Sequence, residues 1–405
     1  MTTFKTMDLP ESLLHTLQSM NYDKPTPIQE KTIPLALEGK DILGSAQTGT
    51  GKTAAFGIPL IVKLLADPNS SALVLTPTRE LADQVLKQLR QMLGQRSKVQ
   101  TALLIGGDPM PKQLQQLKRN PQLVVGTPGR VNDHLKRKSL SLTKTNFLVL
   151  DETDRMLDMG FSIQIDEILT HMKPKRQTLL FSATLAKKIA QIAEKYLKDP
   201  ARVSVSSTTA PATNIKQENV YVTETEKYDK LCAELEQRNG SIIVFVKTKY
   251  NADKMSAKLS KQGFDTDAIH GDLRQNKRER VLNNFRKKKY RVLIATDVAA
   301  RGLDVPHIEH VINYDLPQSP EDYVHRIGRT ARAGASGEAL NFISNGDKAK
   351  WHAIEHFIDP ESRPPRTKVQ DKKGKKPFKK NFSKNSKKPF LKKNKPKFSP
   401  RKKSA

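Results

Sequence analysis

The segment Ala46–Thr53 places the strongest constraint on how this chain folds. It reads A-Q-T-G-T-G-K-T and stands between a short apolar run, Ile42–Leu43, and a helical pattern that begins near Lys52. Its two glycines let the backbone turn so that several N–H groups point at one anion, and the helix start adds the positive end of its dipole. The segment therefore predicts a phosphate-binding loop between a strand and a helix.

Two side chains of this loop suit a nucleoside triphosphate. Lys52 can reach the β and γ phosphates, and the Thr53 hydroxyl can ligate Mg²⁺. The general pattern G-x-x-x-x-G-K-[ST] has glycine where this chain has Ala46. A glycine-rich loop without a nucleotide is therefore an alternative that the loop alone leaves open.

Apolar runs that alternate with helical patterns predict an α/β fold with parallel sheets flanked by helices. Ligands of such sheets bind at the carboxyl ends of the strands, so the polar segments that directly follow the runs are candidate site segments. The expected strands are 42–43, 73–75, 123–125, 147–150 and 179–181, then 242–246, 268–269, 292–295, 311–313 and 340–343.

Composition divides the chain into four parts. A length of 405 residues exceeds one ordinary core, and the short polar stretch 206–213 is typical of a linker. We expect an N-terminal domain at 1–205 with the phosphate loop and a second domain at 214–360 without one. Residues 361–405 lack periodicity and are expected to be disordered.

The charge balance predicts a polyanionic partner. The chain carries a net charge of +29, and residues 361–405 hold 19 Lys or Arg against two acids, a net of +17. Such an excess favours nucleic acid, with affinity that falls steeply in salt. Phenylalanines among the tail lysines can stack on unpaired bases, which predicts an RNA-binding tail. A merely solubilising tail is the alternative.

Cysteine usage and the lack of long apolar runs indicate a compartment. Cys232 is the only cysteine, so an intramolecular disulfide is excluded and a reducing compartment fits. No apolar run approaches the roughly 20 residues that a membrane span needs. We expect a cytoplasmic protein that contacts no membrane. Cys232 is expected to be buried, and His352 and His356 to be surface residues rather than metal ligands.

Two adjacent carboxylates, Asp151 and Glu152, end a fully apolar run. Charges there are costly unless a cation or a water network uses them. After a phosphate loop they suit a Mg²⁺ site and a residue that orients the attacking water. The alternative is an acidic cluster at a helix start, since Asp154 and Asp158 lie nearby.

A basic cluster stands at His325–Arg332, H-R-I-G-R-T-A-R. Arg329 and Arg332 are predicted to reach a γ phosphate held by the other domain and to stabilise the charge of phosphoryl transfer. A structural or RNA-facing basic helix is the alternative.

These segments, in this order, resemble the motifs of the DEAD-box RNA helicases of superfamily 2. The resemblance covers almost all of residues 4–345, and Ala46 is usual in that family's loop. The phrase 154–161, D-R-M-L-D-M-G-F, resembles the bacterial RhlE-type subgroup. The matching segments are Phe4 and Tyr22 with Pro25–Gln29, then Ala46–Thr53, Pro77–Ala82, Gly106–Gly107, Thr127–Arg130, Asp151–Asp154, Ser182–Thr184, Val244–Thr248, His270–Asp272, Gln275 with Arg278, Ala295–Asp297, Ala300–Asp304 and His325–Arg332.

The resemblance implies two tandem RecA-like domains, with ATP and Mg²⁺ as cofactors. Tyr22 would stack on adenine and Gln29 would hydrogen-bond its edge. The implied nucleotide-binding residues are Phe4, Tyr22, Gln29, Ala46, Gln47, Thr48, Gly49, Thr50, Gly51, Lys52, Thr53 and, at the ribose, Asp304.

The resemblance also implies the catalytic and RNA-binding residues. Glu152 would be the general base, and Asp151, through water, and Thr53 would hold Mg²⁺. Arg329 and Arg332 would be arginine fingers. Ser182 and Thr184 would couple hydrolysis to strand separation. The RNA backbone would lie along Thr78, Arg79, Gly106, Gly107, Thr127 and Arg130 in the first domain and along Gly271, Gln275, Arg278 and Thr296 in the second.

The expected function is an ATP-dependent RNA helicase that locally unwinds or remodels duplexes and ribonucleoproteins with low sequence specificity. We expect a monomer, with ribosomal precursor particles or the RNA-decay machinery as candidate partners. A DNA helicase or translocase is one alternative, and a non-catalytic RNA annealer or ATP-gated clamp is another.

Three positions depart from the family pattern. Thr153 replaces alanine in the motif that names the family and is expected to shift the strand end slightly. Ala331 replaces a common glycine and is expected to be tolerated in a helix. Asn21 also replaces a common glycine, and asparagine accepts left-handed backbone.

Overall fold

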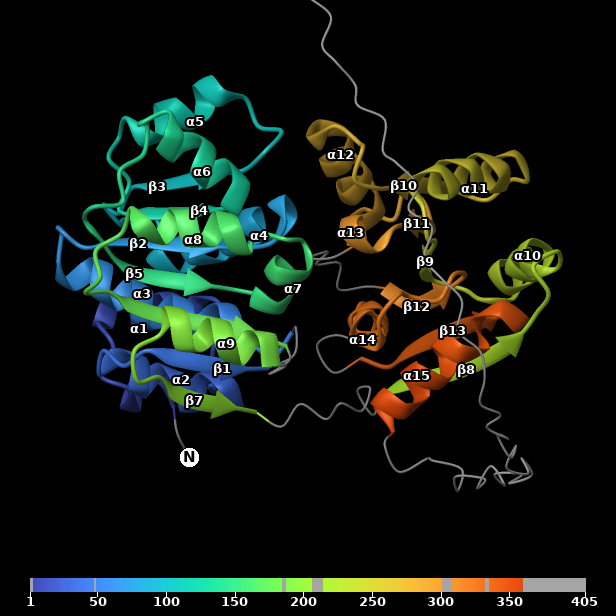
Figure 1. The fold of residues 1–405 in the computed structure, drawn as a ribbon, viewed down its shortest axis with the longest axis horizontal. Helices are drawn as coiled ribbons and strands as arrows, with labels where there is room; N and C mark the ends of the chain where they lie inside the picture. The colour runs from blue at the N-terminus through green and yellow to red at the C-terminus, as the bar shows by residue number, and fades with distance from the viewer. Residues whose placement is uncertain are drawn as a thin grey trace, which may run out of the picture. The chain divides into compact units, whose positions relative to one another are not determined.

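The computed structural model describes residues 3–46, 49–183, 187–205, 214–300, 308–331 and 335–359. Two parallel β-sheets lie in these residues, within the compact unit Met1–Ser362 (Figure 1). The predicted linker 206–213 and tail 361–405 lie outside the described residues, and the predicted domain boundaries stay predictions. The part of the chain that the structure describes contains no helix long and apolar enough to span a membrane.

The first sheet and its helices occupy the N-terminal half. The elements are η1 (Phe4–Thr6), α1 (Glu11–Ser19), α2 (Pro27–Leu37), β1 (Ile42–Ser45), α3 (Lys52–Ala66), β2 (Ser71–Leu75), α4 (Arg79–Leu93), β3 (Thr101–Leu104), α5 (Met110–Leu117), β4 (Leu123–Gly126), α6 (Pro128–Lys136), β5 (Thr145–Leu150), α7 (Thr153–Asp158), α8 (Ser162–Thr170), β6 (Gln177–Ser182), α9 (Lys187–Tyr196) and β7 (Ala201–Ser204).

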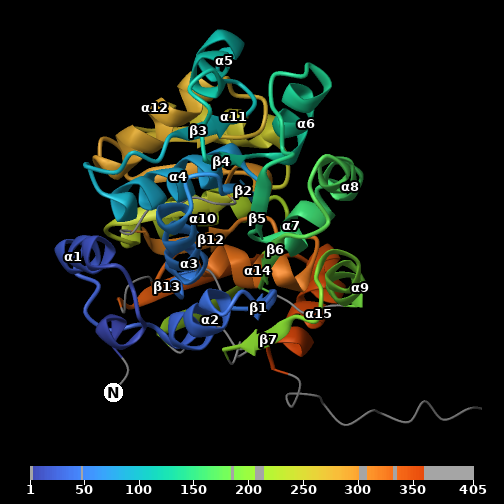
Figure 2. The ribbon, with the colours of Figure 1, turned by 90° about the vertical axis from the view of Figure 1, so that its left-hand side faces the viewer.

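Seven strands form this sheet in the order β3-β4-β2-β5-β6-β1-β7, and every pair is parallel. Successive residues of each strand face opposite sides, so two cores form. On one side, Val149 and Phe181 pack with apolar residues of α1 to α4. On the other side, Leu148 and Leu180 pack with α6 to α9 (Figure 2). The strand ends are therefore held rigidly between two helical layers.

The second sheet follows the same plan. Its elements are β8 (Ile215–Tyr221), α10 (Lys227–Gln237), β9 (Ser241–Phe245), α11 (Lys249–Lys261), β10 (Thr266–Ile269), α12 (Gln275–Arg286), β11 (Val292–Ala295), α13 (Asp297–Ala300), β12 (Ile308–Asn313), α14 (Pro320–Ile327), β13 (Gly337–Ile343), η3 (Asn345–Asp347) and α15 (Lys348–Ile358).

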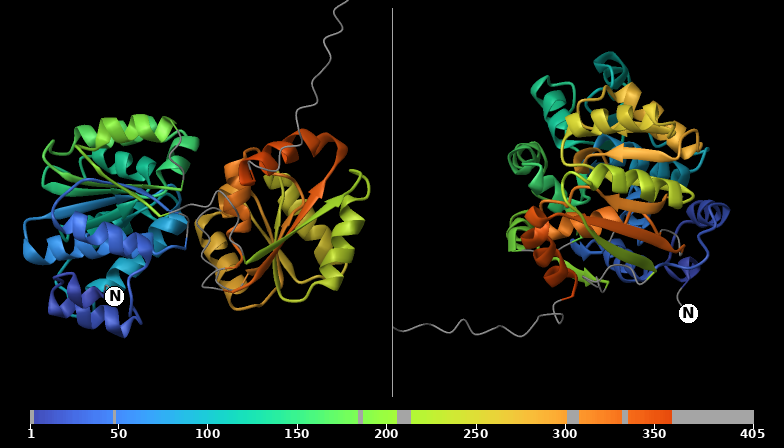
Figure 3. Two further views of the ribbon diagram at one scale, coloured as in Figure 1. Left: turned by 90° about the horizontal axis from the view of Figure 1, so that it is seen from below. Right: turned by 90° about the vertical axis from the view of Figure 1, so that its right-hand side faces the viewer.

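Six parallel strands form the second sheet in the order β10-β11-β9-β12-β13-β8. Val244 packs toward α10 and α11, and Phe245 toward α12. A third cluster joins Tyr323 of α14 to Trp351 of α15 over β8 and β13. Figure 3 shows helices on both faces of this sheet.

The predicted fold class is confirmed, but three strands were missed. They are β3, β7 and β8, and each is an edge strand of its sheet. Their sequences, T-A-L-L, A-R-V-S and I-K-Q-E-N-V-Y, mix buried and exposed positions. An edge strand needs no continuous apolar run, so the run-based prediction could not find them.

Backbone geometry tests the expectations for two of the residues that depart from the family pattern, Asn21 and Ala331. Asn21 has φ 59°, so the expected left-handed turn is confirmed. The expectation for Ala331 is wrong, because α14 ends at Ile327 and Ala331 lies in the following turn with φ 56°. A left-handed conformation is unfavourable for alanine and easy for glycine, so Ala331 is strained there.

The expectation that Cys232 is buried is also wrong. Its side chain is half-buried on α10, with the thiol directed at the Gln262 Oε1 at 3.3 Å. The amphipathic pattern of α10 identifies the helix. It does not decide how far a residue at the edge of the apolar face, such as Cys232, is buried.

Candidate functional site

The loop after β1 has the backbone of an anion cradle. Gly49 and Gly51 have φ 87° and 91°, a region that glycine adopts without steric cost. Lys52 begins α3 and is only 7% exposed, with its Nζ donating to the Ala46 carbonyl at 2.9 Å. Gln47 and Thr48 lie outside the described residues. The ammonium group is therefore held over the loop, at the positive end of a 15-residue helix.

The start of α2, with its N-cap Thr26, supports this loop. The Thr26 hydroxyl donates to the Thr50 carbonyl at 2.8 Å, and the Gln29 Nε2 donates to the Gly51 carbonyl at 3.1 Å. The Gln29 Oε1 accepts from the Thr26 N–H at 3.0 Å. A Cβ on Gly51 would overlap the Gln29 amide, so this close approach requires glycine. Gln29 thus holds the loop and keeps a second N–H with which to meet a base.

Tyr22 lies beside this segment. Its ring meets Phe4 edge-on with centroids 6.1 Å apart, and its hydroxyl accepts from the Gln88 Nε2 at 2.8 Å. Phe4 is buried and Tyr22 is half-buried. The Tyr22 ring is therefore fixed at the wall of the cavity described below, while Phe4 supports it from behind.

Asp151 and Glu152 follow β5 as expected. The Asp151 Oδ1 accepts from the Glu152 N–H at 3.0 Å, and Glu152 has the left-handed φ of 52°. Burial raises the pKa of Asp151 to about 6, although Lys52 opposes the shift. Burial also disfavours ionised Glu152, but Arg155, Lys52 and Arg329 outweigh it and lower the pKa of Glu152. The pKa values of these two adjacent carboxyls are therefore shifted in opposite directions.

Arg155 explains this difference, and sequence reasoning missed it. Its Nη1 lies 2.8 Å from the Glu152 Oε2, and its side chain is 2% exposed. The sequence does place Arg155 three residues after Glu152, at the start of α7. Side chains three residues apart lie on the same side of a helix, so this spacing could have indicated the pair. Without knowing that α7 is buried there, the sequence gives no reason to separate Arg155 from a surface arginine.

The next motif contacts the same corner. The Asp154 Oδ2 accepts from the Ala183 N–H at 2.9 Å, and Ser182 is fully buried at the end of β6. Thr184 lies outside the described residues. Thr153 is buried too, and its hydroxyl donates to the Leu150 carbonyl at 3.2 Å. The threonine is therefore accommodated with a hydrogen bond, and Asp154 joins the carboxylate motif to the segment predicted to couple hydrolysis to RNA.

A cavity of about 1170 Å³ collects several of the predicted nucleotide and catalytic residues, whereas Phe4, Gln29, Ala46 and Thr50 are not among its lining residues. It is large enough for a nucleotide and is open to solvent. Segments far apart in the sequence meet at its wall. Among its lining residues are Tyr22, Gly49, Gly51, Lys52, Thr53, Asp151, Glu152 and Arg329.

The arginines of 325–332 divide into different roles. Arg326 is structural, because its guanidinium makes two bonds to Asp297 at 2.6 and 2.7 Å and lies over the Phe245 ring. Arg329 is 3% exposed, and its Nε donates to the His325 carbonyl at 3.0 Å. Arg332 and the predicted ribose contact Asp304 lie outside the described residues.

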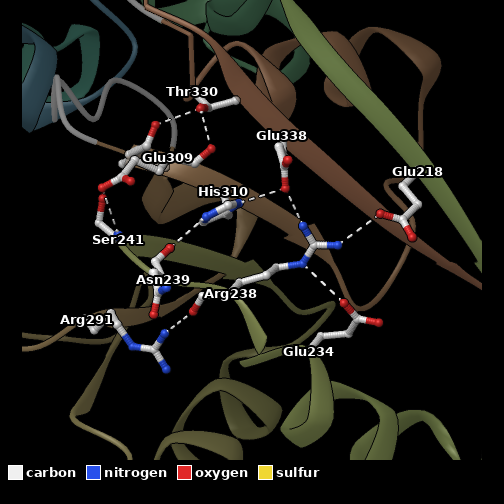
Figure 4. Close-up of polar contacts among 11 residues, drawn as sticks. Glu218, Glu234, Arg238, Asn239, Ser241, Arg291, Glu309, His310, Thr330 and Glu338 are labelled. Carbon is white, nitrogen blue, oxygen red and sulfur yellow. Dashed lines mark hydrogen bonds and ion pairs between the residues drawn. The ribbon is translucent and has the colours of Figure 1, made fainter. Parts of the chain in front are cut away.

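Thr330 fixes the turn that carries Arg329. Its buried hydroxyl lies 2.7 and 2.9 Å from the Ile308 and Glu309 carbonyl oxygens at the start of β12 (Figure 4). The Glu309 carboxylate in turn accepts from the Ser241 N–H at 3.3 Å. The turn is thereby attached to two strands of the second sheet.

A second cavity, of about 440 Å³, collects predicted RNA residues. Those that line it are Thr78, Arg79, Gly106, Thr127, Arg130, Gly271 and Arg278. A Cβ on Gly107 would overlap the Arg79 guanidinium and crowd Gln275, but neither Gly107 nor Gln275 is among the residues that line this cavity, and Gln275 lines the 1170 Å³ cavity. Thr296 is not among the lining residues and lies at the end of β11, where its N–H donates to the Ile269 carbonyl.

Arg278 has a further partner that the sequence did not indicate. Its Nε lies 2.7 Å from the Glu80 Oε1, and its Nη1 donates to the His270 carbonyl at 3.0 Å. Glu80 belongs to α4 of the first sheet and Arg278 to α12 of the second. Both side chains are buried, so this pair joins the two halves of the compact unit.

Known proteins match this chain over most of its length. The DEAD/DEAH box helicase model matches residues 26–192, and the helicase conserved C-terminal domain model matches 226–334. The chain is 45% identical over 355 residues to the DEAD-box ATP-dependent RNA helicase CshA of Bacillus subtilis (strain 168), covering 87% of this chain and 72% of the relative. The chain belongs to the DEAD-box family of ATP-dependent RNA helicases.

Other relatives of this helicase agree. The ATP-dependent RNA helicase CshA of Listeria monocytogenes is 46% identical and covers 90% of this chain and 70% of its own length. The S. cerevisiae Dbp5 structure bound to RNA and ADP BeF3 has TM-score 0.81 at 34% identity, covering 89% and 94% of the two chains. Mss116p bound to ssRNA and AMP-PNP has TM-score 0.79 at 29% identity, covering 87% and 77%. The tandem RecA-like fold is thereby confirmed.

Proposed function

We propose that this helicase hydrolyses ATP in the 1170 Å³ cavity and uses the cycle to separate short RNA duplexes locally. One observation carries the proposal. The phosphate loop, two adjacent carboxylates and a buried arginine, all from separate segments, line one cavity large enough for a nucleotide.

The residues present fit a nucleoside triphosphate with Mg²⁺. The loop glycines form an anion cradle, and Lys52 supplies a cation within it. No cluster of three or more His, Cys, Asp or Glu in the described part of the chain could hold a metal. Thr53 and Asp151 would therefore share the ion with phosphate oxygens and waters, as Mg²⁺ commonly requires. When bound, Mg²⁺ would neutralise charge on the β and γ phosphates.

Glu152 is proposed to orient the attacking water and accept its proton as the bond to the γ phosphorus forms and the bridging oxygen leaves. The lowered pKa of Glu152 keeps it ionised near neutral pH, and Arg155 fixes its direction. Arg329 and Lys52 would stabilise charge on the transferring group. Arg332 and Asp304 are proposed for the second arginine finger and the ribose contact on the resemblance alone.

RNA is proposed to bind in the 440 Å³ cavity through its backbone. Threonine hydroxyls, arginines and close-packed glycines suit phosphate and ribose rather than base edges, so sequence preference should be low. Asp154 connects the carboxylate motif to Ala183, which gives a physical route between ATP and RNA sites. Ser182 and Thr184 are proposed to act in this coupling.

The test is a Glu152→Gln variant. Glutamine keeps the shape and an acceptor for Arg155 but cannot take a proton at neutral pH. RNA-stimulated hydrolysis should fall roughly 10²–10⁴-fold, while ATP and RNA still bind. Glu11→Gln on exposed α1 serves as the control and should keep full activity. Normal turnover in Glu152→Gln would reject the assignment, and strand release without ATP would favour an annealer.

Several finer predictions stay predictions. The RhlE-type subgroup rests on the phrase 154–161, whereas the relatives above carry the name CshA. Cytoplasmic location, a monomer, an RNA-binding tail, and ribosomal precursor particles or RNA-decay machinery as partners rest on the sequence. A comparison of ATPase stimulation by RNA and by DNA separates this function from that of a DNA translocase.

A further inference from the structure

Three asparagines stand side by side on the strands β12, β13 and β8. Asn313 pairs in register with Asn341, and Asn341 pairs in register with Asn219 of the edge strand. Asn313 and Asn341 have no exposed surface. The opposite face of β12 and β13 is apolar there, with Ile312 and Leu340 in a core cluster. The asparagine ladder, Asn313, Asn341 and Asn219, therefore lies on the face of the sheet that α14 and α15 cover.

Hydrogen bonding gives the asparagine ladder one direction. Arg326 of α14 can only donate, and its Nη1 lies 3.0 Å from the Asn313 Oδ1, so that oxygen accepts. The Asn313 Nδ2 then donates to the Asn341 Oδ1 at 2.8 Å, and the Asn341 Nδ2 donates to the Asn219 Oδ1 at 2.9 Å. Each amide is thereby oriented by the group before it, starting from Arg326.

Tyr323 gives α14 a second contact with the ladder. Its buried ring meets Trp351 edge-on with centroids 5.6 Å apart, and its hydroxyl accepts from the Asn341 Nδ2 at 3.0 Å. The same hydroxyl donates to the Gln217 Oε1 at 2.7 Å. Because Tyr323 and Arg326 are three residues apart, they lie on the same side of α14. Two contacts about one turn apart therefore fix the position of the helix along the sheet and its rotation.

The ladder needs a reason, because burying amides is unfavourable unless they are paired. Apolar residues fill the opposite face of the same strands and have no such requirement. A paired polar network instead fixes one arrangement of the groups that it joins. Arg326, where the network starts, also binds the Asp297 carboxylate at 2.6 and 2.7 Å and the Asp315 carbonyl at 2.6 Å. The ladder is thus explained by the placement of α14 rather than by the stability of the sheet.

Arg329 is attached directly to the helix that the ladder fixes. Its N–H donates to the Arg326 carbonyl, and its Nε donates to the His325 carbonyl, both at 3.0 Å. Its buried side chain lines the 1170 Å³ cavity. A displacement of α14 would therefore displace the Arg329 guanidinium, and a group that stabilises a transition state must be held to within about 0.5 Å.

We propose that Asn313 and Asn341 are positioning residues for hydrolysis, which hold α14 so that Arg329 stands at the phosphates of ATP. They act through Arg329, since neither asparagine lines the 1170 Å³ or the 440 Å³ cavity. This inference rests on the proposed function, because it takes Arg329 as a residue that stabilises the transferring phosphoryl group.

The first test is Asn341→Leu in the full chain, which keeps a similar volume and removes the central hydrogen bonds. The kcat of RNA-stimulated ATP hydrolysis should fall about tenfold, because a small displacement of a group that acts in the transition state is costly. The KM for ATP and the affinity for RNA should change by less than about twofold.

Leu340→Ala is the matched control for Asn341→Leu. Leu340 precedes Asn341 on β13 and faces the apolar side of the sheet. Its truncation leaves a cavity in the core, so the melting temperature should fall at least as far as in Asn341→Leu. The kcat per folded molecule should not change, because α14 keeps both of its contacts with the ladder.

A double-mutant cycle tests whether the ladder acts through Arg329. Arg329→Ala alone should lower kcat by roughly 10²-fold. Adding Asn341→Leu should lower it no further, because the group being positioned is already absent. Tyr323→Phe removes one hydroxyl and keeps the ring, so it replaces Asn341→Leu in the cycle if that variant does not fold. Alone it should lower kcat about threefold, and it should have no effect beside Arg329→Ala.

Several outcomes would overturn the proposal. Losses in kcat that multiply when Asn341→Leu and Arg329→Ala are combined would show that the two residues act separately. A lower melting temperature with unchanged kcat in Asn341→Leu would assign the ladder to stability alone, and so would an equal fall in kcat in Leu340→Ala. If Arg329→Ala keeps the full rate, the proposed function of Arg329 itself fails.

Discussion

His134 lies at the end of α6 with no exposed surface. Its Nε2 is 3.2 Å from the Gln113 Oε1, and its Nδ1 is 2.8 Å from the Ser139 Oγ. The Gln113 amide N–H groups donate to the Ile105 and Asp108 carbonyls, so its oxygen must accept from His134. With the neutral ring protonated on Nε2, Nδ1 accepts from the Ser139 hydroxyl, whose single proton then is not donated to the His134 carbonyl, 3.1 Å away.

This histidine gives the protein a pH-dependent stability. Burial, followed by the charge of Arg130, lowers the pKa of His134. The unfolded chain therefore takes up a proton first as the pH falls, and stability present above about pH 6.5 is lost below it. Thermal unfolding from pH 7.5 to 5 should show a shallower decline in His134→Gln than in the unaltered protein. Exposed His15→Gln should not change the decline, and an identical decline in His134→Gln would contradict the assignment.

At the scale of elements, the starts of α2 and α3 are joined through one amide. Gln29 accepts from Thr26 at the start of its own helix and donates to Gly51 at the start of the next. Because both bonds are local to the loop, Gln29 acts on the phosphate cradle as well as on any adenine. A base-recognition role alone would not require the bond to Gly51.

A Gln29→Glu variant separates these two roles. The new carboxylate would face the Gly51 carbonyl without a proton to donate, so the loop should lose its support. We expect affinity for inorganic tripolyphosphate, which has no base, to fall about tenfold, as loss of one bond and the added repulsion imply. Gln18→Glu on α1 is the control. If only ATP binding weakens and tripolyphosphate binding does not, Gln29 serves the base alone.

The elements also show what the sequence can and cannot predict. Lys52, Asp151 and Glu152 follow apolar runs, and parallel strands bring their carboxyl ends to one edge, so their proximity follows from the pattern. Arg155 could not be predicted, because its role depends on the burial of α7. Ala331 was misplaced because the helix was extended past Gly328, which is the C-cap of α14 and an ordinary signal for the end of a helix. The edge strands β3, β7 and β8 escaped because they lack a continuous apolar run, whereas the edge strand β10 was predicted.

At the scale of the whole molecule, Glu80 and Arg278 join the two sheets' domains beside the predicted RNA residues. The Arg79 Nη1 also lies 3.4 Å from the Gln275 Oε1 at the same place. A buried pair is strongly destabilised when one partner is removed, because the other charge stays uncompensated. Because Glu80 belongs to α4 of the first sheet and Arg278 to α12 of the second, we expect that cost to fall on the joining of the domains.

A double-mutant cycle tests this link. Glu80→Gln and Arg278→Gln should each lower RNA-stimulated ATPase activity about tenfold or more, and the double variant should be no worse than Arg278→Gln alone, because that change already removes the pair. Melting of the protein without RNA should shift little. The exchange Glu80→Arg with Arg278→Glu restores the opposite charges and should recover part of the activity. Additive losses, or no recovery in the exchanged pair, would show that the two residues act separately on RNA.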